Sequence, residues 1–217
     1  MLIEGSNDND FFTSAKEWVI ESYPAFGGES LEASSDIYAD LFNLYEKRGI
    51  RDIDIMASGA AGVIDKIKSA FGSDGGIIHY RGDVEMADTD NYNQGPGVVF
   101  IEGTLTINQK VKVADNTALV FVVSENISVA GDPNAVKEVD GFYITNGTFS
   151  SGSSNNQLVV NGAAIAFGGF PIDTLDRDLG PANQTTPAEL FNYQPAYLWL
   201  MRDIAGESAA TFRELPP

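Results

Sequence analysis

Residues 97–109 read GVVFIEGTLTINQ and residues 118–130 read ALVFVVSENISVA, and these two stretches decide the fold of the chain. Each is a short apolar run, then a break at a small or polar residue, then a second short apolar run. The same unit recurs as GIIHYRGDVEMAD at 76–88, GFYITNGTFSSG at 141–152 and QLVVNGAAIAFGG at 157–169. The first strand residues of the five units are 21, 21, 23 and 16 residues apart, at Ile77, Val98, Leu119, Phe142 and Leu158. A unit that returns about every 20 residues is typical of a solenoid, in which each turn of the chain covers the next.

The breaks inside the units suit the corners of a parallel β-helix. Gly82, Gly103 and Gly162 stand at three of the breaks, and Asn126 and Asn146 stand at the other two. Both residue types tolerate the positive φ that a sharp bend between strands often needs. We therefore expect a mainly β protein with helices, built on a parallel β-helix or solenoid of about five short rungs. The alternative is a β-sandwich or jelly roll, in which turns join antiparallel neighbours about every 8–12 residues.

The solenoid is expected over residues 76–180, between two segments that cap its ends. Residues 1–75 carry three apolar stripes at helical spacing. The predicted helices lie at residues 11–23, 36–48 and 60–71. Residues 181–217 are predicted to form a C-terminal cap with short helices, one of them starting at the capping-box sequence Thr186-Pro-Ala-Glu189. Such caps are needed because uncovered solenoid ends pair with strands of other chains.

The charge balance argues against several classes of partner. The chain of 217 residues has 31 acidic and 13 basic side chains, a formal net charge of −18. It has no surplus of Lys and Arg to displace phosphate counterions, so no nucleic-acid partner is expected. The absence of cysteine excludes disulfides, thiolate zinc sites and thiol nucleophiles. The single histidine, His79, has no Cys or second His to act with, and it is interpreted as structural.

Export is expected for this chain, although the sequence carries no recognisable leader. The first ten residues, MLIEGSNDND, have neither a basic nor an apolar region. No run of about 18 apolar residues occurs, so we expect no direct membrane insertion of this segment. We interpret it as a piece of a larger exported protein that is extracellular or displayed at the cell surface.

Residues 88–93, Asp-Thr-Asp-Asn-Tyr-Asn, predict a calcium site. Carboxylates and amides at alternating positions resemble a calcium-binding loop, with Asp88 and Asp90 as the candidate ligands. An EF-hand does not fit, because Tyr92 takes the fifth position and no Glu follows at the twelfth. The alternative is a solvated loop rich in turn-forming residues. No other cofactor is expected.

Three carboxylates surround Arg177 in PIDTLDRDLG, residues 171–180. Asp173, Asp176 and Asp178 are therefore the candidate ligand-binding residues, because paired carboxylates can do acid–base work on a glycoside. The alternative is a salt-bridged corner in which Arg177 pairs with a neighbouring Asp. No catalytic residue is assigned, and we do not expect the chain to be an enzyme.

One long stretch, residues 141–172, carries no charged side chain. It alternates apolar strands with Ser, Asn, Thr and Gly. It is either a neutral side of the solenoid or a contact face, because a surface without charges costs less to desolvate when a partner binds.

The late part of the chain carries the motifs of a resemblance. These motifs are Arg177-Asp-Leu-Gly180, Thr185-Thr-Pro-Ala-Glu-Leu-Phe191 and Tyr193-x-Pro195. Together with the repeated units and the aromatic helix near residues 36–49, they resemble the C-terminal region of large surface proteins of ultrasmall, uncultivated bacteria of the candidate phyla radiation. The resemblance implies export and surface display, but no activity and no catalytic residues. The link before Arg177 is longer than is usual in that family.

Three functions follow as hypotheses. The first is a non-catalytic structural or adhesive domain of an exported cell-surface protein, with a surface protein or a glycan as its partner. The second is a carbohydrate-binding or carbohydrate-active β-helix that uses Asp173, Asp176 and Asp178. The third is a polymer-forming, self-associating solenoid similar to the bactofilins, which build β-helices from a shorter unit.

Overall fold

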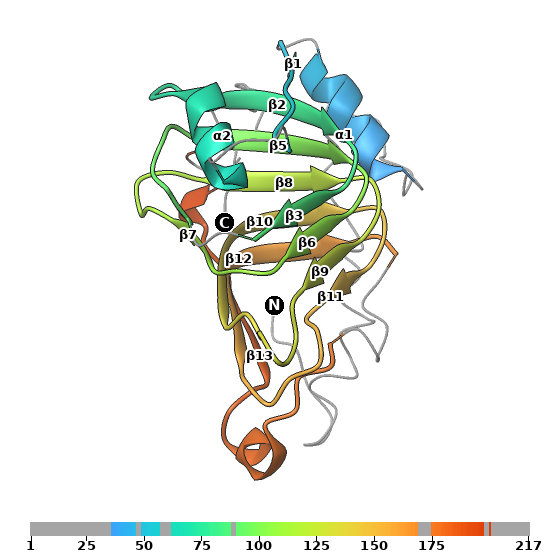
Figure 1. The fold of residues 1–217 in the computed structure, drawn as a ribbon, viewed down its shortest axis with the longest axis vertical. Helices are drawn as coiled ribbons and strands as arrows, with labels where there is room; N and C mark the ends of the chain where they lie inside the picture. The colour runs from blue at the N-terminus through green and yellow to red at the C-terminus, as the bar shows by residue number, and fades with distance from the viewer. Residues whose placement is uncertain are drawn as a thin grey trace, which may run out of the picture. The chain divides into compact units, whose positions relative to one another are not determined.

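The computed structural model describes the chain at residues 36–46, 49–56, 62–87, 90–168, 175–197 and 200. A parallel β-solenoid of about four turns lies between residues 76 and 166, with two short helices before it and further strands after it (Figure 1). Every strand pair in the described part of the chain is parallel. The predicted solenoid is therefore confirmed, and the sandwich and jelly-roll alternatives are wrong.

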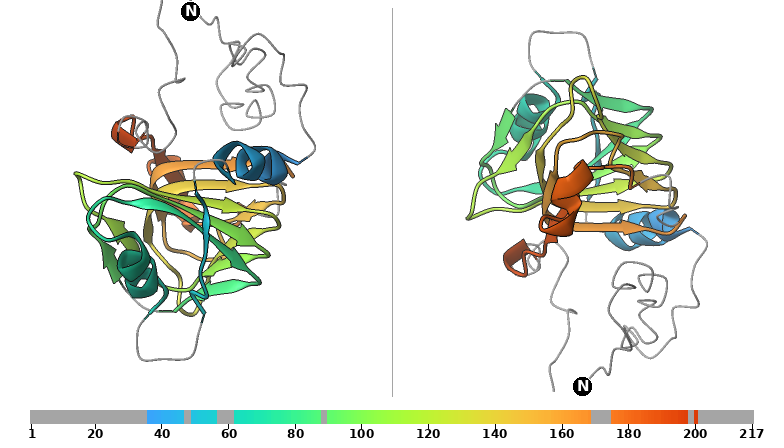
Figure 2. Two further views of the ribbon diagram at one scale, coloured as in Figure 1. Left: turned by 90° about the horizontal axis from the view of Figure 1, so that it is seen from above. Right: turned by 90° about the horizontal axis from the view of Figure 1, so that it is seen from below.

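Each turn of the solenoid contributes strands to three faces. The first face stacks β1 (Arg51–Asp52), β2 (Gly76–Arg81), β5 (Gly97–Glu102), β8 (Leu119–Val123), β10 (Glu138–Thr145) and β12 (Leu158–Ala166). The second face stacks β3 (Val84–Met86), β6 (Leu105–Ile107), β9 (Ile127–Val129) and β11 (Phe149–Ser150). The third face holds β4 (Asp90–Tyr92), β7 (Val111–Val113), the first halves of β10 and β12, and β13 (Glu189–Asn192). Figure 2, viewed from above and below, shows how these faces surround a common interior.

The register differs from the sequence expectation at two of the five units. Paired residues on the first face are Ile77, Val98, Val120, Phe142 and Ala163. The third unit therefore aligns one residue later than expected, at Val120 instead of Leu119. The fifth aligns five residues later, at Ala163 instead of Leu158, because β12 starts on the third face and passes round the corner before it reaches the first. With this register the number of residues between corresponding positions of successive units is nearly constant.

Glycine makes the continuous corner of β10 and β12 possible. Gly141 and Gly162 have φ values of 132° and 150°, which other residues rarely adopt. The two glycines are paired with each other, and a Cβ on Gly162 would overlap the carbonyl oxygen of Gly141. Both the backbone conformation and the close approach of successive turns thus require glycine here.

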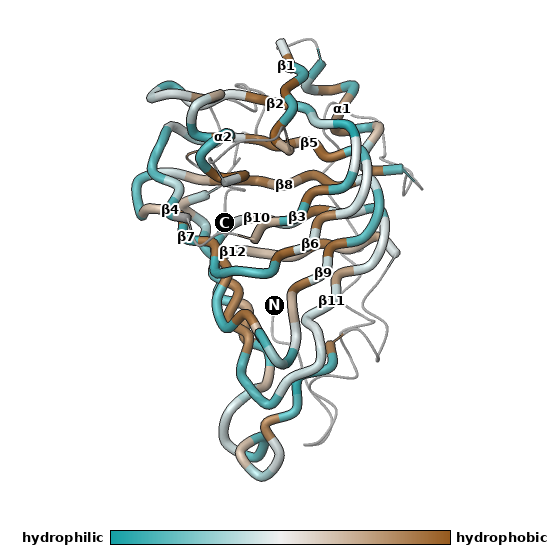
Figure 3. The backbone as a smooth tube through the Cα atoms, viewed as in Figure 1, coloured by the Kyte–Doolittle hydropathy of each residue, from teal (hydrophilic) through white to brown (hydrophobic). Residues whose placement is uncertain are grey.

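Stacked apolar side chains fill the interior. Successive turns place Ile78, Val99, Phe121 and Tyr143 in one ladder, each with no exposed surface. The rings of Phe121 and Tyr143 stack with centroids 5.6 Å apart. Figure 3 shows hydrophobic residues running along the strands of each turn. Burial of one such side chain contributes about 1.5–3 kcal/mol, so the ladders supply most of the stability that a rung lacks alone.

Two of the predicted helices lie among the described residues. α1 (Ile37–Glu46) packs on the outer side of the first face, where Phe42 contacts Phe100 and His79 through edge-to-face ring contacts. α2 (Val63–Phe71) contacts all three strands of the first turn, β2, β3 and β4, and so lies across the N-terminal end of the solenoid. The helix predicted at residues 11–23 lies outside the described residues.

Two local expectations are corrected. A short helix does not begin at Thr186; a 3-10 helix occupies Gly180–Gln184, and Glu189–Asn192 forms β13, whose Phe191 contacts the core residue Phe149. Residues 90–92 are a strand rather than loop, because every turn needs a third side and Tyr92 supplies the buried residue for it. None of the described helices has the length and apolar character needed to cross a membrane.

Candidate functional site

The last turn of the solenoid has a free strand edge. β12 pairs with β10 along residues 159–166, but β13 pairs on its other side only with residues 158–161. No strand in the described part of the chain pairs with the outer side of residues 162–166. The C-terminal end of the first face therefore presents unpaired main-chain groups, which are a template for another strand.

The sequence at the next corner explains why the solenoid stops here. Asn161 pairs with Asn192, so Tyr193 takes the position that Gly162 holds one turn earlier. A tyrosine rarely adopts the positive φ of that corner. Tyr193 leaves the sheet instead and stacks on Phe142 with ring centroids 6.1 Å apart, and Tyr197 packs on the same ring at 5.3 Å. In the described part of the chain the first face therefore has no seventh strand after β1 and the strands of the five units.

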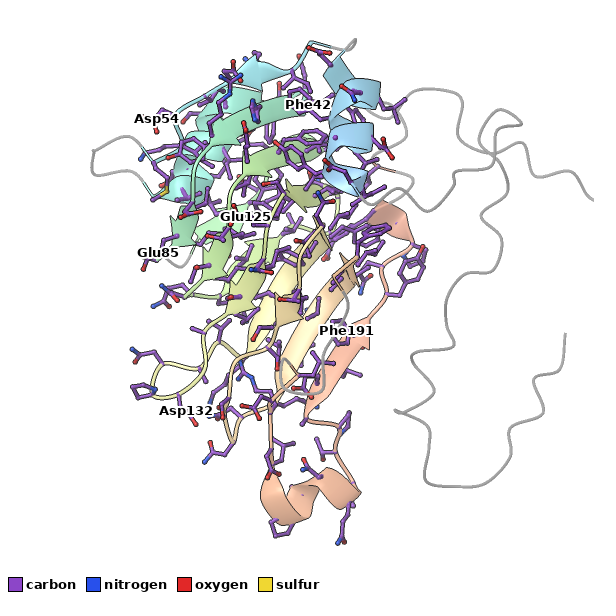
Figure 4. All side chains as sticks on the ribbon, turned by 90° about the vertical axis from the view of Figure 1, so that its right-hand side faces the viewer. Phe42, Asp54, Glu85, Glu125, Asp132 and Phe191 are labelled. Carbon is purple, nitrogen blue, oxygen red and sulfur yellow. The ribbon has the colours of Figure 1, made fainter. Side chains whose placement is uncertain are left out.

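Exposed apolar side chains gather at this end. Among the described residues six large hydrophobic side chains are exposed, and four of them belong to the last turn or follow it: Ile165 (39%), Phe167 (47%), Phe191 (38%) and Tyr193 (57%). Figure 4 shows Phe191 on β13, remote from α1 and its Phe42. We call these four side chains and the free edge of residues 162–166 the terminal-rung surface. Single exposed apolar residues are ordinary, but their concentration at one end marks a candidate binding surface.

The terminal-rung surface is also free of charge. No residue between 141 and 168 is charged, so neither β12 nor the main part of β10 contributes an ion. The uncharged stretch noted in the sequence therefore lies on the strands that end the solenoid. Its use as a contact face remains a prediction.

A ladder of polar side chains holds the strands beneath Tyr193 in register. The Asn192 amide donates to Asn161 (3.0 Å), and the Asn161 amide donates to the Asp140 carboxylate (2.8 Å). Asp140 is 7% exposed and also accepts a hydrogen bond from the Val113 main chain (3.0 Å). These groups satisfy one another, so the ladder positions the surface and does not itself bind a ligand. In the sequence Asp140 and Asn161 are single polar residues that each precede a glycine, and this pattern alone does not predict the ladder.

Glu138 extends the ladder with an ion pair. Its carboxylate accepts a hydrogen bond from Lys110, which lowers the pKa of Glu138 below its ordinary value of 4.5. The amide of Asn161 donates to the same carboxylate (3.1 Å).

The two described carboxylates next to Arg177 lie at the surface. Asp176 and Asp178 are both exposed, while Arg177 between them is 5% exposed. Asp178 accepts hydrogen bonds from the main chain of Gly180 and the amide of Asn183, both at 2.7 Å, and so caps the following turn. Asp173 lies outside the described residues. Ligand binding by these three residues remains a prediction.

Arg177 organises main-chain carbonyls instead of pairing with a neighbouring Asp. Its guanidinium donates to the carbonyl oxygens of Ser151 (2.8 Å), Ala130 (3.0 Å) and Asn156 (3.3 Å). Burial lowers the pKa of Arg177, and the nearby charges of Glu189 and Asp132 act in the opposite direction. The buried guanidinium therefore ties together connections between strands of the solenoid, after β9 and between β11 and β12, which is a structural role.

The calcium prediction concerns residues that are only partly described. Asp90 begins β4 and pairs with Val111, while Asp88 lies outside the described residues. Among the described residues no group of three or more His, Cys, Asp and Glu side chains is placed to hold a metal ion. Calcium binding by Asp88 and Asp90 remains a prediction.

His79 is a buried polar residue at the N-terminal end, and its partner Asp52 is exposed. It is 3% exposed, and its Nδ1 lies 2.7 Å from the Asp52 carboxylate of β1. Nε2 has no hydrogen-bond partner and lies 3.6 Å from the Glu102 carboxylate. The ring of Phe42 covers the imidazole with centroids 4.9 Å apart, so the pair holds β1 and α1 in place. Alternation in the sequence placed His79 on a strand but did not reveal Asp52 as its partner.

A polar cleft lies on another side of the solenoid. It has a volume of about 420 Å³ and lies between the ends of β6 and β9. Its lining residues are Ala87, Asn108, Gln109, Ala130, Gly131, Asp132, Pro133 and Asn134. The volume is in the range of small-ligand sites, but no aromatic side chain lines the cleft, although aromatic rings are common in such sites.

No protein-family model, no curated protein and no solved structure matches this chain.

Proposed function

We propose that the chain is a structural or adhesive domain of an exported cell-surface protein, and that it acts by binding a partner through the terminal-rung surface. The observation that carries the proposal is the clustering of four exposed apolar side chains beside a free strand edge in an uncharged part of the chain. A surface of this kind loses little hydration energy on binding, and its aromatic residues are of the type that dominates interface energetics.

The rest of the fold supports a display role. Rungs joined by continuous parallel ladders form a rigid body that holds its last turn in a fixed geometry. The net charge of −18 keeps such molecules soluble and apart, except where their surfaces lack charge. The export and surface location in this proposal rest on the resemblance to surface proteins of the candidate phyla radiation.

An adhesion assay tests this function. Beads coated with the chain are washed over bacterial cells, immobilised glycans and a layer of the chain itself, and retained beads are counted. We expect retention on at least one of these surfaces, and a several-fold loss with the double variant Phe167→Ser/Tyr193→Ser. Leu44→Ser is the matched control, because Leu44 is an equally exposed apolar residue (55%) on α1. Retention no greater than that of albumin-coated beads, or equal retention of all variants, would contradict the proposal.

The polar cleft favours carbohydrate binding as a second candidate function. The side chain of Asn134 and the amide oxygen of Asn108 suit sugar hydroxyls, in a cleft of about 420 Å³, while the Asn108 amide nitrogen already donates to Glu85 (2.7 Å). Binding on a glycan array that Asn134→Trp abolishes by filling the cleft would support it. Binding that survives this variant would exclude the cleft as the carbohydrate site.

A further inference from the structure

We infer that the free edge of β12 pairs with the same edge of a second copy of this chain, so that two copies form a symmetric dimer. The inference rests on the proposed function, because it names the partner of the terminal-rung surface. Residues 162–166 are bonded to β10 on one side and unpaired on the other within the described part of the chain. A further strand would satisfy these main-chain groups and cover Ile165.

The edge lacks the features that normally prevent strand addition. Natural edges are protected by prolines, charged side chains, bulges or a covering loop. The edge here reads Gly-Ala-Ala-Ile-Ala and holds neither a proline nor a charge. Its small side chains let another backbone approach closely. By contrast, at the opposite end of the first face β1 pairs with Ile78 and His79 of β2 and places two charged residues, Arg51 and Asp52, at the edge.

The charge distribution favours a second copy as the occupant. Two copies each carry a net charge of −18 and repel over most of their surface. They repel least where neither surface carries charge, and residues 141–168 form such a region on both. A basic partner would gain nothing at this edge and would be drawn to the acidic surfaces elsewhere. The edge therefore suits a partner as acidic as the chain itself.

A two-fold axis between the edges limits the assembly to two copies. Identical edges related by a two-fold axis run antiparallel, and each satisfies the unpaired groups of the other. The same contact covers Ile165 and Phe167 of both copies, which are exposed in one copy alone. Because both edges are consumed, such a pair has no free edge from which a filament could grow.

Sedimentation velocity of the full chain, from micromolar to near-millimolar concentration, tests the inference. We expect a concentration-dependent species of twice the 23.3 kDa chain mass. Ile165→Lys places two like charges in the contact and should shift the dimerisation midpoint at least tenfold to higher concentration. Leu44→Lys, which adds the same charge at an exposed apolar residue of α1, should leave the midpoint unchanged. Circular dichroism of both variants checks the fold, and Phe167→Glu replaces Ile165→Lys if that variant misfolds.

Three outcomes would overturn the inference. The first is a monomer at every concentration, and the second is a dimer that neither edge variant weakens. The third is a series of growing filaments, which would indicate head-to-tail assembly of the bactofilin kind. Hydrogen exchange adds a further check, because the amides of residues 162–166 that do not donate to β10 should gain protection only in the dimer. Protection at concentrations where the chain is monomeric would show that its own chain covers the edge. The adhesion assay stays independent, because beads bound to cells through Phe167 and Tyr193 by a monomeric chain would retain the proposed function and exclude the dimer.

Discussion

The two ends of the solenoid are built from the same kind of strand but are finished differently. At the N-terminal end α2 lies across the first turn, with Ile64, Ile67 and Phe71 buried and Phe71 in contact with Tyr92. At the C-terminal end the first face stops at β12, and Ile165, Phe167 and Phe191 remain partly exposed. The comparison shows that the solvent exposure of an end rung depends on the segment that precedes or follows it, and not on the sequence of the rung itself.

The largest effect is expected where the N-terminal end is closed. Phe71→Ala should lower the free energy of unfolding by about 3 kcal/mol or more, because it opens a cavity between α2 and the first turn. Phe191→Ala at the open end removes the same atoms from a half-covered position and should cost no more than about 1.5 kcal/mol. Urea unfolding followed by circular dichroism measures both. Equal losses would show that the two ends are closed to the same extent.

Substitution of the glycine at the corner of β12 should destabilise the chain more than substitution of a glycine outside the solenoid. Gly162→Ala forces a Cβ against the Gly141 carbonyl at φ 150°, and we expect a loss of about 2 kcal/mol or more. Gly180→Ala is the control, because Gly180 also has a positive φ (60°) but has open space around its Cα. Its expected loss is about 1 kcal/mol. Thermal unfolding measures the loss of stability of both variants. A larger loss for Gly180→Ala than for Gly162→Ala would contradict this account.

The contact between buried His79 and Asp52 predicts a smaller loss of stability, at the N-terminal end of the solenoid. Asp52→Ala leaves the His79 Nδ1 group without its partner and should cost about 1 kcal/mol. His79→Phe keeps the ring beneath Phe42 and removes both polar nitrogens, so its cost should be smaller still. A double-mutant cycle measures the coupling between the two residues. Additive losses would mean that Asp52 and His79 contribute independently.

The smallest effect concerns Glu138 and acid. Because the pKa of Glu138 is lowered in the folded chain, its contribution to stability is present above pH 4.5 and is lost as the pH falls through that lowered pKa. Lys110→Met should remove the contribution, about 0.5 kcal/mol for a pair this exposed. Urea unfolding should therefore show a larger difference between the variant and the parent at pH 7 than at pH 3. A constant difference at both pH values would assign the effect to packing of the Lys110 side chain.

Much of the architecture could be read from the repeated units, but the candidate site could not. Alternation in residues 97–109 and 118–130 was enough to indicate short parallel strands, since only stacking can bury such runs. The carboxylates around Arg177 were candidate ligand-binding residues in the sequence. The structure leaves Asp176 and Asp178 exposed and buries Arg177 against carbonyls, because successive residues of an extended segment point to opposite sides. Local sequence shows which residues are neighbours along the chain, not which groups meet across it.

The sequence by itself determined the period, the parallel stacking and the uncharged character of residues 141–172, because these depend on local composition and spacing. Only the tertiary structure decided where the stacking ends. The register that pairs Asn161 with Asn192 places Tyr193 where a glycine is needed, and the ring of Phe142 then draws Tyr193 out of the sheet. Both are contacts between residues 31 or more positions apart. Within the described part of the chain they leave a neutral strand edge open, and that edge is what the proposed partner contact uses.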